Sequence, residues 1–469
     1  MRLTRLTLSN FRCFESLQIE LHPEMTVLIA PNGSGKTTLL DAVRIALWPF
    51  VKGFDLGTQA GKGASIQITD VRLSKQTADN MEPQLPCKIE AHGTWDDKSA
   101  SPRTWVQMRE RIKPGTNTLG DVESKQLTQF AGELEKQVRD QSTTVTLPLV
   151  SYLGTSRLWY EGRFTSIAEE VALSTSDYSR TSGYLNCLSY SSSFKTFTAW
   201  YGWIFRSYRE EQIHALEKGT PLSETGQRFS NVIEVIKTAV DTLTADATGW
   251  HGLEYKASQN QQLVMHHEQF GCMPVDMLSD GVRNAIAMVA DLAFRAYKLN
   301  PHLGAKAARL TPGIALIDEV DMFLHPSWQQ TIVNALRRAF PLVQFIVTTH
   351  SPQVLSTVKQ ENIRIIDVTP QGLTTAAPPL GASYGEPSGN VLHSVMMVDP
   401  VPPISEKPAL QRLTELVDQG LYRSVEVEQL MRYLIAVLGE QHPQLQRLQR
   451  SIQRQTRLGN MQSAGNSGR

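Results

Sequence analysis

The sequence predicts an α/β fold with a mixed β lobe, a parallel-sheet core, a helical insertion and a small helical tail at the C-terminal end. Three observations support this prediction. The apolar segment 26–29 has the pattern of a short buried strand, and a glycine-rich turn and an apolar pattern at helical spacing follow it. A second apolar segment, 313–317, ends in two acidic residues. Between these halves, residues 160–265 show long helical patterns.

Length and composition exclude several classes of protein. The 469 residues suit two or three domains, or one large domain that carries an insertion. Lys plus Arg and Asp plus Glu both number 46, so the net charge gives no support to a strongly basic nucleic-acid-binding protein. The four cysteines lie far apart without a C-x-x-C pair, which argues against a structural zinc site and a disulfide framework. Without a signal-peptide pattern or a membrane-spanning stretch, we expect a soluble cytoplasmic protein with no membrane contact.

The N-terminal segments 3–8 and 16–21 alternate between polar and apolar residues, which predicts two half-exposed strands. The alternation returns at 64–73 and 87–95, so we expect the first lobe to continue as β-sheet. Arg12 lies between the first two strands. It has two equally supported interpretations: a cation placed against nucleotide phosphates, or a surface arginine in a hairpin turn.

A candidate phosphate-binding loop occupies residues 30–38, between the strand at 26–29 and the helix that follows. Glycines let backbone amides turn inward, and the helix N-terminus adds the positive end of its dipole. Lys36 is expected to reach the β and γ phosphates of ATP, and Thr37 to offer its hydroxyl to Mg²⁺. Ala30 replaces the usual first glycine, a change we expect to cause only a small local adjustment. The loop residues predicted to bind nucleotide are Asn32, Gly33, Ser34, Gly35, Lys36, Thr37 and Thr38.

In the middle of the chain, the spacing of apolar residues predicts a helix at 123–141, a buried strand at 145–153 and two long helices at 194–212 and 226–244. Arg157 follows the strand, and its position favours an ordinary loop arginine over a phosphate contact. An aromatic and apolar stripe on the first long helix favours a core position over a base-stacking platform; its members are Phe194, Phe197, Trp200, Tyr201, Ile204 and Phe205. Sustained heptads are lacking, so we expect no long coiled coil.

The acidic pair Asp318 and Glu319 ends the apolar strand of the second half. In a phosphate-loop ATPase, the first carboxylate holds Mg²⁺ and the second polarises the attacking water. Ser279 and Gly281 precede a helical pattern at 284–297. By themselves they indicate an ordinary helix N-cap as strongly as a functional motif. His350 follows another apolar strand, where a neutral imidazole is suited to hydrogen-bond a γ-phosphate.

The order of these motifs resembles the ATP-binding-cassette ATPases of the SMC/RecF-like branch. The resemblance covers about residues 1–95 and 266–365 and assigns the Walker A loop, the signature motif 278–283, Walker B at 314–319, the D-loop region 320–326 and the switch histidine His350. It implies that Arg12 contacts nucleotide and that Ser279 and Gly281 complete the site of the opposite subunit. His325 in the D-loop region has a less certain role. Asp280 departs from the glycine common in transporters, as in defence-associated members of the branch.

Four further features are the segment 149–157, the region of Cys187 with Trp200, the Leu-Ser-Asp-Gly signature, and the linker residues 383–385 before a short helical tail. Together they carry a looser resemblance to the PtuA ATPases of Septu-type antiphage systems and of related retrons. It implies an ATPase that forms homodimers through its ATP sites, assembles further and controls a separate HNH-type, PtuB-like nuclease. Residues 366–469 lack the acidic cluster of a Toprim nuclease domain and lack a His-Asn-His pattern. The alternative is a RecF/SMC-like DNA-repair clamp, for which DNA is the partner; the membrane-transporter class is disfavoured by the large insertion.

These patterns divide the chain into six predicted parts. Two ATPase segments, 1–159 and 266–365, flank the helical insertion 160–265. A Pro/Gly-rich linker is expected at 366–400 and a tail of three short helices at 401–458, with helical patterns at 410–418, 425–438 and 445–456. Residues 459–469 are rich in Gly, Ser and Asn, so we expect them to be disordered.

Overall fold

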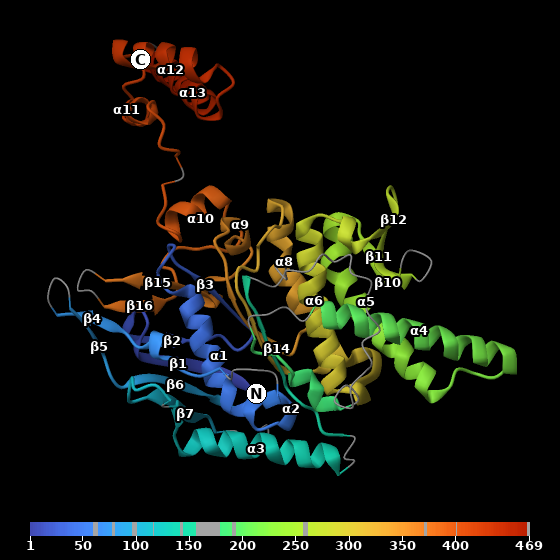
Figure 1. The fold of residues 1–469 in the computed structure, drawn as a ribbon. Helices are drawn as coiled ribbons and strands as arrows, with labels where there is room; N and C mark the ends of the chain where they lie inside the picture. Colours follow the sequence, from blue (N-terminus) through green and yellow to red (C-terminus); the bar gives the residue numbers. More distant parts are fainter. Residues whose placement is uncertain are drawn as a thin grey trace. The chain divides into compact units, whose positions relative to one another are not determined.

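The computed structural model describes the chain except residues 60–63, 77–79, 96–100, 116, 141–143, 156–178, 190–193, 257–260, 370–372, 400 and 467–469. It forms two compact units, Met1–Met396 and Met397–Arg469 (Figure 1). Arg157 lies outside the described residues. In the described part of the chain, no helix is long and apolar enough to cross a membrane.

The N-terminal lobe is an antiparallel sheet in the order β2-β1-β6-β7-β8. Its strands are β1 (Arg2–Phe11), β2 (Phe14–Glu20), β6 (Cys87–Thr94), β7 (Arg103–Arg109) and β8 (Leu119–Gly120). Burial alternates along β6, as the sequence pattern predicts.

The segment 64–73 is not a strand of this sheet, contrary to the sequence prediction. It contains the 3₁₀ turn η1 (Ile68–Asp70) and ends at β4 (Leu73–Lys75), which pairs with β5 (Met81–Pro83) in a separate hairpin. The Asp70 carboxylate accepts a 2.7 Å hydrogen bond from the Gln67 amide. This local capping bond favours the turn over a strand ladder.

The core sheet has the order β16-β15-β3-β14-β13-β9 and is parallel except for the β15–β16 pair. All residues of β3, β9, β13 and β14 are buried, as expected for a sheet covered on both faces. The parallel strands bring their C-terminal ends to one edge. The bounds are β3 (Met25–Ile29), β9 (Leu149–Leu153), β13 (Gly313–Ile317), β14 (Val343–Thr348), β15 (Ile363–Val368) and β16 (Thr374–Ala377).

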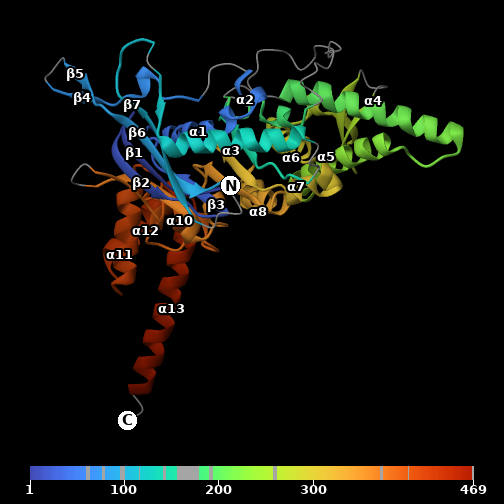
Figure 2. The same ribbon diagram turned by 90° about the horizontal axis from the view of Figure 1, so that it is seen from below.

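Helix α1 (Lys36–Lys52) packs between the two sheets, because it contacts β6 and β7 of one sheet and β9 and β14 of the other. The indole Nε1 of Trp105 donates a 2.8 Å hydrogen bond to the Ala46 carbonyl, which fixes the lobe to this helix. Helix α3 (Val122–Arg139) runs beside α1 (Figure 2). The other helices around the core sheet are α2 (Asp55–Gln59), α6 (Asp280–Leu299), α7 (Ala307–Leu310), α8 (Pro326–Ala339) and α9 (Pro352–Leu355).

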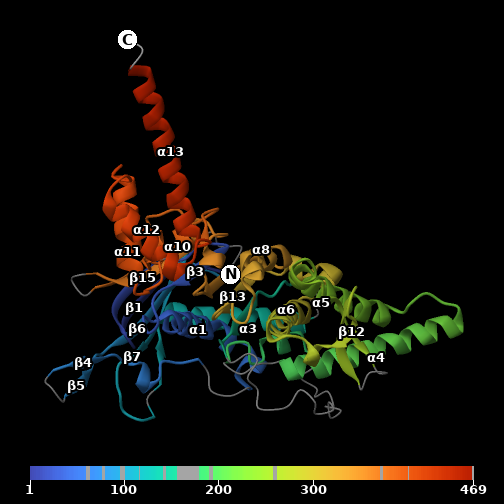
Figure 3. The ribbon, with the colours of Figure 1, turned by 90° about the horizontal axis from the view of Figure 1, so that it is seen from above.

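The two long helices of the insertion are α4 (Phe194–Lys218) and α5 (Glu224–Thr248), which lie side by side and extend away from the core sheet (Figures 1 and 3). The described side chains of the predicted stripe, from Phe197 to Phe205, are buried, so the core interpretation is confirmed for them. The insertion is not wholly helical. Its C-terminal part enters a small antiparallel sheet of β10 (His251–Lys256), β11 (Gln262–His267) and β12 (Gly271–Pro274), which continues past the predicted boundary at residue 265.

The described residues of 366–396 pack within the first unit and do not form the linker that the sequence predicts at 366–400. Strand β16 pairs with β15 at the edge of the core sheet, and α10 (Ser388–Ser394) places Val391 and Val395 in the main hydrophobic core. Burial of these valines explains why the Pro/Gly-rich segment folds onto the first unit. Short 3₁₀ turns complete this unit at η4 (Arg180–Tyr184), η5 (Val275–Met277), η6 (Pro301–Lys306) and η7 (Gln360–Asn362).

The second unit contains α11 (Lys407–Asp418), α12 (Val425–Leu438) and α13 (Pro443–Asn466). Leucines from the three helices form a separate core, including Leu413, Leu434 and Leu445. The three predicted tail helices are therefore present. Helix α13 continues to Asn466, so residues 459–466 are helical, where the sequence predicts disorder. No proline follows Pro443 to interrupt the helix.

Candidate ATP-binding site

The phosphate loop turns sharply between β3 and α1. Gly33 and Gly35 have φ values of 81° and 93°, in the left-handed region that favours glycine. A Cβ atom on Gly35 would lie 2.4 Å from Cζ of Phe14 and 2.8 Å from Sγ of Cys13. The second glycine is therefore required both by the backbone conformation and by the close approach of the β1–β2 turn.

Lys36 is buried at the first position of α1. Its Nζ atom donates to the carbonyls of Ala30 and Pro31 over 2.8 and 3.2 Å. Burial lowers the pKa of Lys36, and the nearby carboxylates of Asp318 and Glu319 oppose this shift only in part. The ammonium group thus lies over its own loop, and Ala30 takes part through its backbone carbonyl.

Three parallel strands bring the acidic pair to the loop. The Thr37 hydroxyl donates a 2.9 Å hydrogen bond to Oδ2 of Asp318, and the Thr348 hydroxyl donates a 2.6 Å bond to Oδ1. Thr348 also accepts a 2.7 Å bond from the amide of Glu319. The side chains of Asp318 and Thr348 are buried, so these bonds fix the carboxylate in one orientation. Thr348 is a site residue that the sequence analysis missed; its only signal was a hydroxyl at the end of an apolar strand.

Glu319 has a φ value of 49°, which is rare for a residue other than glycine. The Val320 amide donates a 3.0 Å bond to the Thr348 carbonyl and holds this turn at the strand end. Strained backbone at a strand terminus is frequent where a side chain must be directed at a reacting group.

The donors at this edge fit a divalent cation. The Thr37 hydroxyl and the Asp318 carboxylate supply hard oxygen ligands within hydrogen-bonding distance of each other, as a phosphate-bound Mg²⁺ requires. The described residues contain no group of three or more His, Cys, Asp and Glu side chains able to hold a metal by themselves, at this edge or elsewhere.

The signature segment begins α6. Ser279 stands at the N-cap position, is exposed and makes no side-chain capping bond to its helix. Gly281 is buried, and a Cβ atom there would lie 2.5 Å from the Phe323 carbonyl oxygen. Asn284 donates a 2.9 Å hydrogen bond to the Met322 carbonyl. The start of α6 is thus fixed against the segment that follows the acidic pair, and Ser279 is exposed.

Arg12 pairs with two carboxylates, at 2.7 Å from Asp41 of α1 and 2.8 Å from Asp70. Burial lowers the Arg12 pKa, but the bonds and charges of Asp70 and Asp41 outweigh it, so the pKa is raised overall. The Arg12 backbone is left-handed, with a φ value of 49°. The guanidinium is therefore held beside the helix that follows the phosphate loop, at Asp41, about one and a half turns beyond Lys36.

The two candidate histidines differ. His350 is exposed two residues after the end of β14, and the intervening Thr349 donates a 2.6 Å bond to Asp321. The structure does not bring His350 into the hydrogen-bonded group around Asp318. His325 is the N-cap of α8, where its ring accepts a bond from the Ser327 amide, which is a structural role.

The remaining predicted loop residues line the same turn. Asn32 and Thr37 are exposed, the Ser34 amide donates a 3.3 Å bond to the Pro31 carbonyl, and Thr38 bonds with the Cys13 thiol. The structure thus collects the loop, the acidic pair and Thr348 at one sheet edge.

Comparisons with known proteins identify similar chains. A family model described as an AAA domain matches residues 5–222. A second AAA-domain model, whose description names the AbiEii toxin of type IV TA systems, matches residues 167–356.

Three curated relatives are similar to this chain. The retron Vc95 probable ATPase of Vibrio cholerae serotype O1 biovar El Tor is 26% identical over 398 residues, 78% of this chain and 74% of the relative. The retron Ec83 probable ATPase of Escherichia coli is 26% identical over 508 aligned positions, 97% of this chain and 87% of the relative. The Septu protein PtuA of Bacillus mycoides (strain KBAB4) is 43% identical over 75 residues, 16% of this chain and 10% of the relative.

Proposed function

We propose, from the position of this chain among the SMC/RecF-like ATP-binding-cassette ATPases related to the PtuA and retron ATPases, that it is the regulatory ATPase of an antiphage defence complex. In this proposal the chain binds ATP with Mg²⁺ in the cytoplasm, dimerises through its nucleotide sites and controls a separate nuclease. One observation supports dimerisation most directly. Ser279 is exposed, whereas Thr37, Asp318, Glu319 and Thr348 are joined within one chain.

The roles of the residues follow from their chemistry. Lys36 neutralises phosphate charge, and Thr37 with Asp318 would hold Mg²⁺, which supplies charge neutralisation for phosphoryl transfer. Glu319 orients and polarises the attacking water from the strand end. The Ser279 hydroxyl and the amides at the start of α6 would bind the γ-phosphate held by a second copy, with the helix dipole adding attraction. Each interface would therefore enclose two nucleotides.

Control of a nuclease is supported by two observations. The relatives include a PtuA protein and two retron ATPases, and the three-helix second unit has its own core, separate from that of the ATPase unit. Such a unit suits docking. ATP binding would close the dimer, and nucleotide loss would reopen it. Reopening would change the access of a bound HNH-type nuclease to its nucleic-acid substrate.

The dimer is tested by particle mass with and without ATP, using Glu319→Gln to slow hydrolysis. We expect a dimer or an even-numbered multiple in the presence of ATP. The double variant Glu319→Gln, Ser279→Arg should not form this assembly, because a bulky cation would block the interface. Lys36→Ala should abolish nucleotide binding at the loop. An ATP-independent mass that Ser279→Arg leaves unchanged would refute dimerisation through the nucleotide sites.

The partner is tested by expressing the tagged chain together with its neighbouring genes and purifying it from those cells. A nuclease recovered in fixed ratio, with cutting that changes when ATP is removed, supports the regulatory function. A chain recovered alone, which dimerises with ATP and binds DNA with strong salt dependence, would instead establish the DNA-repair clamp.

A further inference from the structure

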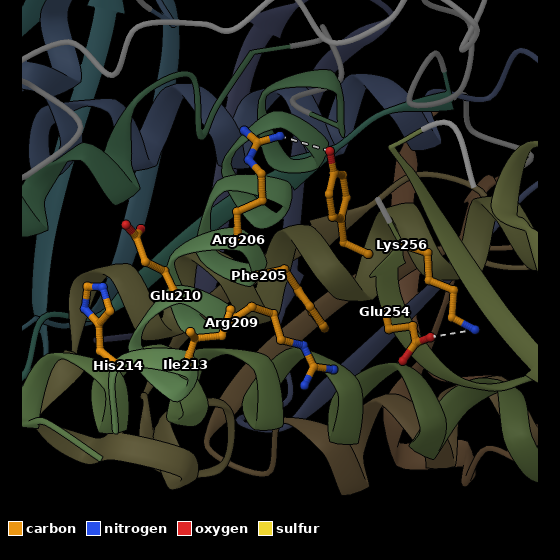
Figure 4. A pocket seen from close by; sticks show the side chains of 9 residues that line it. Phe205, Arg206, Arg209, Glu210, Ile213, His214, Glu254 and Lys256 are labelled. Atoms are coloured by element: carbon orange, nitrogen blue, oxygen red, sulfur yellow. Dashed lines mark hydrogen bonds and ion pairs between the residues drawn. The ribbon is translucent and has the colours of Figure 1, made fainter. Parts of the chain in front are cut away.

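We propose that the insertion carries a second ligand site, distinct from the phosphate loop, that takes a free nucleotide. The site is a pocket of about 590 Å³ between α4 and β10 (Figure 4). This volume lies within the range of small-molecule sites. Its lining residues are Phe205, Arg206, Arg209, Glu210, Ile213, His214, Glu254, Tyr255 and Lys256.

An aromatic surface is fixed on the strand side of the pocket. The Tyr255 ring lies against the backbone of α4 at Gly202, where an added Cβ atom would approach ring atom Cε2 to 2.8 Å. Arg206 donates a 3.0 Å hydrogen bond to the Tyr255 hydroxyl, and its Cζ atom is 5.6 Å from the ring centroid. Aromatic rings and guanidinium planes are the surfaces on which nucleobases stack.

The charges of the pocket favour an anion. Glu254 is neutralised within the protein, because its carboxylate lies 3.0 Å from Lys256 and 3.2 Å from the His266 ring. In Figure 4 the Arg209 guanidinium extends toward the side of the pocket that holds Glu254, and the Glu210 carboxylate points away from Lys256. Arg206 donates to the Tyr255 hydroxyl and Arg209 donates a 2.9 Å hydrogen bond to the Gln212 side chain, and both of these acceptors are neutral. Their remaining N–H groups are able to form charge-assisted bonds with a phosphate group.

A planar base with a phosphate matches both features. The apolar part of the pocket, from Phe205, Ile213 and the Tyr255 ring, would accommodate the base, and the two arginines would bind the phosphate. This site lies on the insertion, whereas the phosphate loop lies at the edge of the core sheet.

The experiment measures nucleotide binding to the full chain by calorimetry in the Lys36→Ala background, which removes the contribution of the phosphate loop. The probes are AMP, ATP and GTP, with inorganic phosphate and a ten-residue oligothymidylate for comparison. We expect a saturable binding event with at least one of the three nucleotides. Arg209→Gln should weaken it about tenfold or more, the loss expected for one charge-assisted bond.

The matched control is Arg228→Gln, which removes the same charge from an exposed position on α5 outside the pocket and should leave the affinity unchanged. Arg209 and Arg228 are both exposed on helices, so neither change is expected to unfold the chain. The proposal is overturned if the Lys36→Ala protein binds none of the nucleotides, if Arg209→Gln has no effect, or if only the oligothymidylate binds.

Discussion

The Thr348 hydroxyl donates a 2.6 Å hydrogen bond to the Asp318 carboxylate and joins the ends of β14 and β13. The same oxygen accepts from the Glu319 amide. One buried hydroxyl thus orients the residue expected to hold Mg²⁺ and the residue expected to position water. Outer-shell hydrogen bonds of this kind fix the geometry of metal ligands.

Thr348→Val should therefore reduce ATP hydrolysis about 10- to 100-fold and raise the Mg²⁺ concentration needed for half-maximal rate. The measurement is steady-state ATPase activity over a range of Mg²⁺ concentrations. Thr348→Ser keeps the hydroxyl and should retain most of the activity. Equal activity in the valine and serine variants would show that this bond does not support catalysis.

Gly281→Ala should lower the melting temperature, because its Cβ atom would lie 2.5 Å from the backbone oxygen of Phe323. Backbone atoms cannot yield as a flexible side chain can, so we expect a loss of about 1–3 kcal/mol in the free energy of unfolding. Gly389→Ala is the matched control, since a Cβ atom added at Gly389 would have nothing within 4 Å. Both are measured by chemical denaturation; similar values for the two would disprove the steric argument.

The Arg12–Asp41 pair should contribute to stability before any nucleotide binds. Asp41 is buried and the Arg12 side chain is 30% exposed, so solvent weakens the pair only in part. We expect Arg12→Gln to lower the free energy of unfolding by about 1–2 kcal/mol. A double-mutant cycle with Asp41→Asn measures the coupling. A coupling energy of zero would show that the contact has no energetic role.

A chain that ends at Met396 should fold and keep nucleotide binding, because the main hydrophobic core ends at Val395 and the second unit has a core of its own. A chain that ends at Glu386 loses the buried Val391 and Val395 and should melt at a lower temperature. Thermal melts and ATP binding of the two truncations decide between them. Loss of ATP binding in the longer form would show that the second unit supports the site.

The thiols of Cys87 and Cys187 should resist alkylation at pH 8, because burial raises the pKa of each to about 12. At pH 8 both are protonated in the folded chain. Their unfolded pKa is lower, so between about pH 8.5 and pH 12 the unfolded chain binds fewer protons and stability falls as pH rises. Mass spectrometry after iodoacetamide treatment should find these two unmodified until denaturant is added; rapid labelling of the folded chain would contradict their burial.

Local patterns were sufficient for much of the fold. The spacing of apolar residues predicted β3, β13 and the helix after the phosphate loop, because each buries its side chains in a regular period. The prediction of a strand at 64–73 was wrong because local hydrogen bonds, among them the one that the Gln67 amide donates to the Asp70 carboxylate, favour a turn there. Alternation in the sequence does not reveal such a bond.

The sequence by itself determined which residues have the chemistry of phosphate and cation binding: Lys36, Thr37, Asp318 and Glu319 were identified from their types and spacing. Tertiary structure alone decided which of these residues meet. It selected Thr348 as the link between the Asp318 carboxylate and the Glu319 backbone amide, placed Arg12 against Asp41, and left Ser279 exposed. The physical reason is that hydrogen bonds between strands distant in sequence depend on sheet order and register, which no local pattern contains.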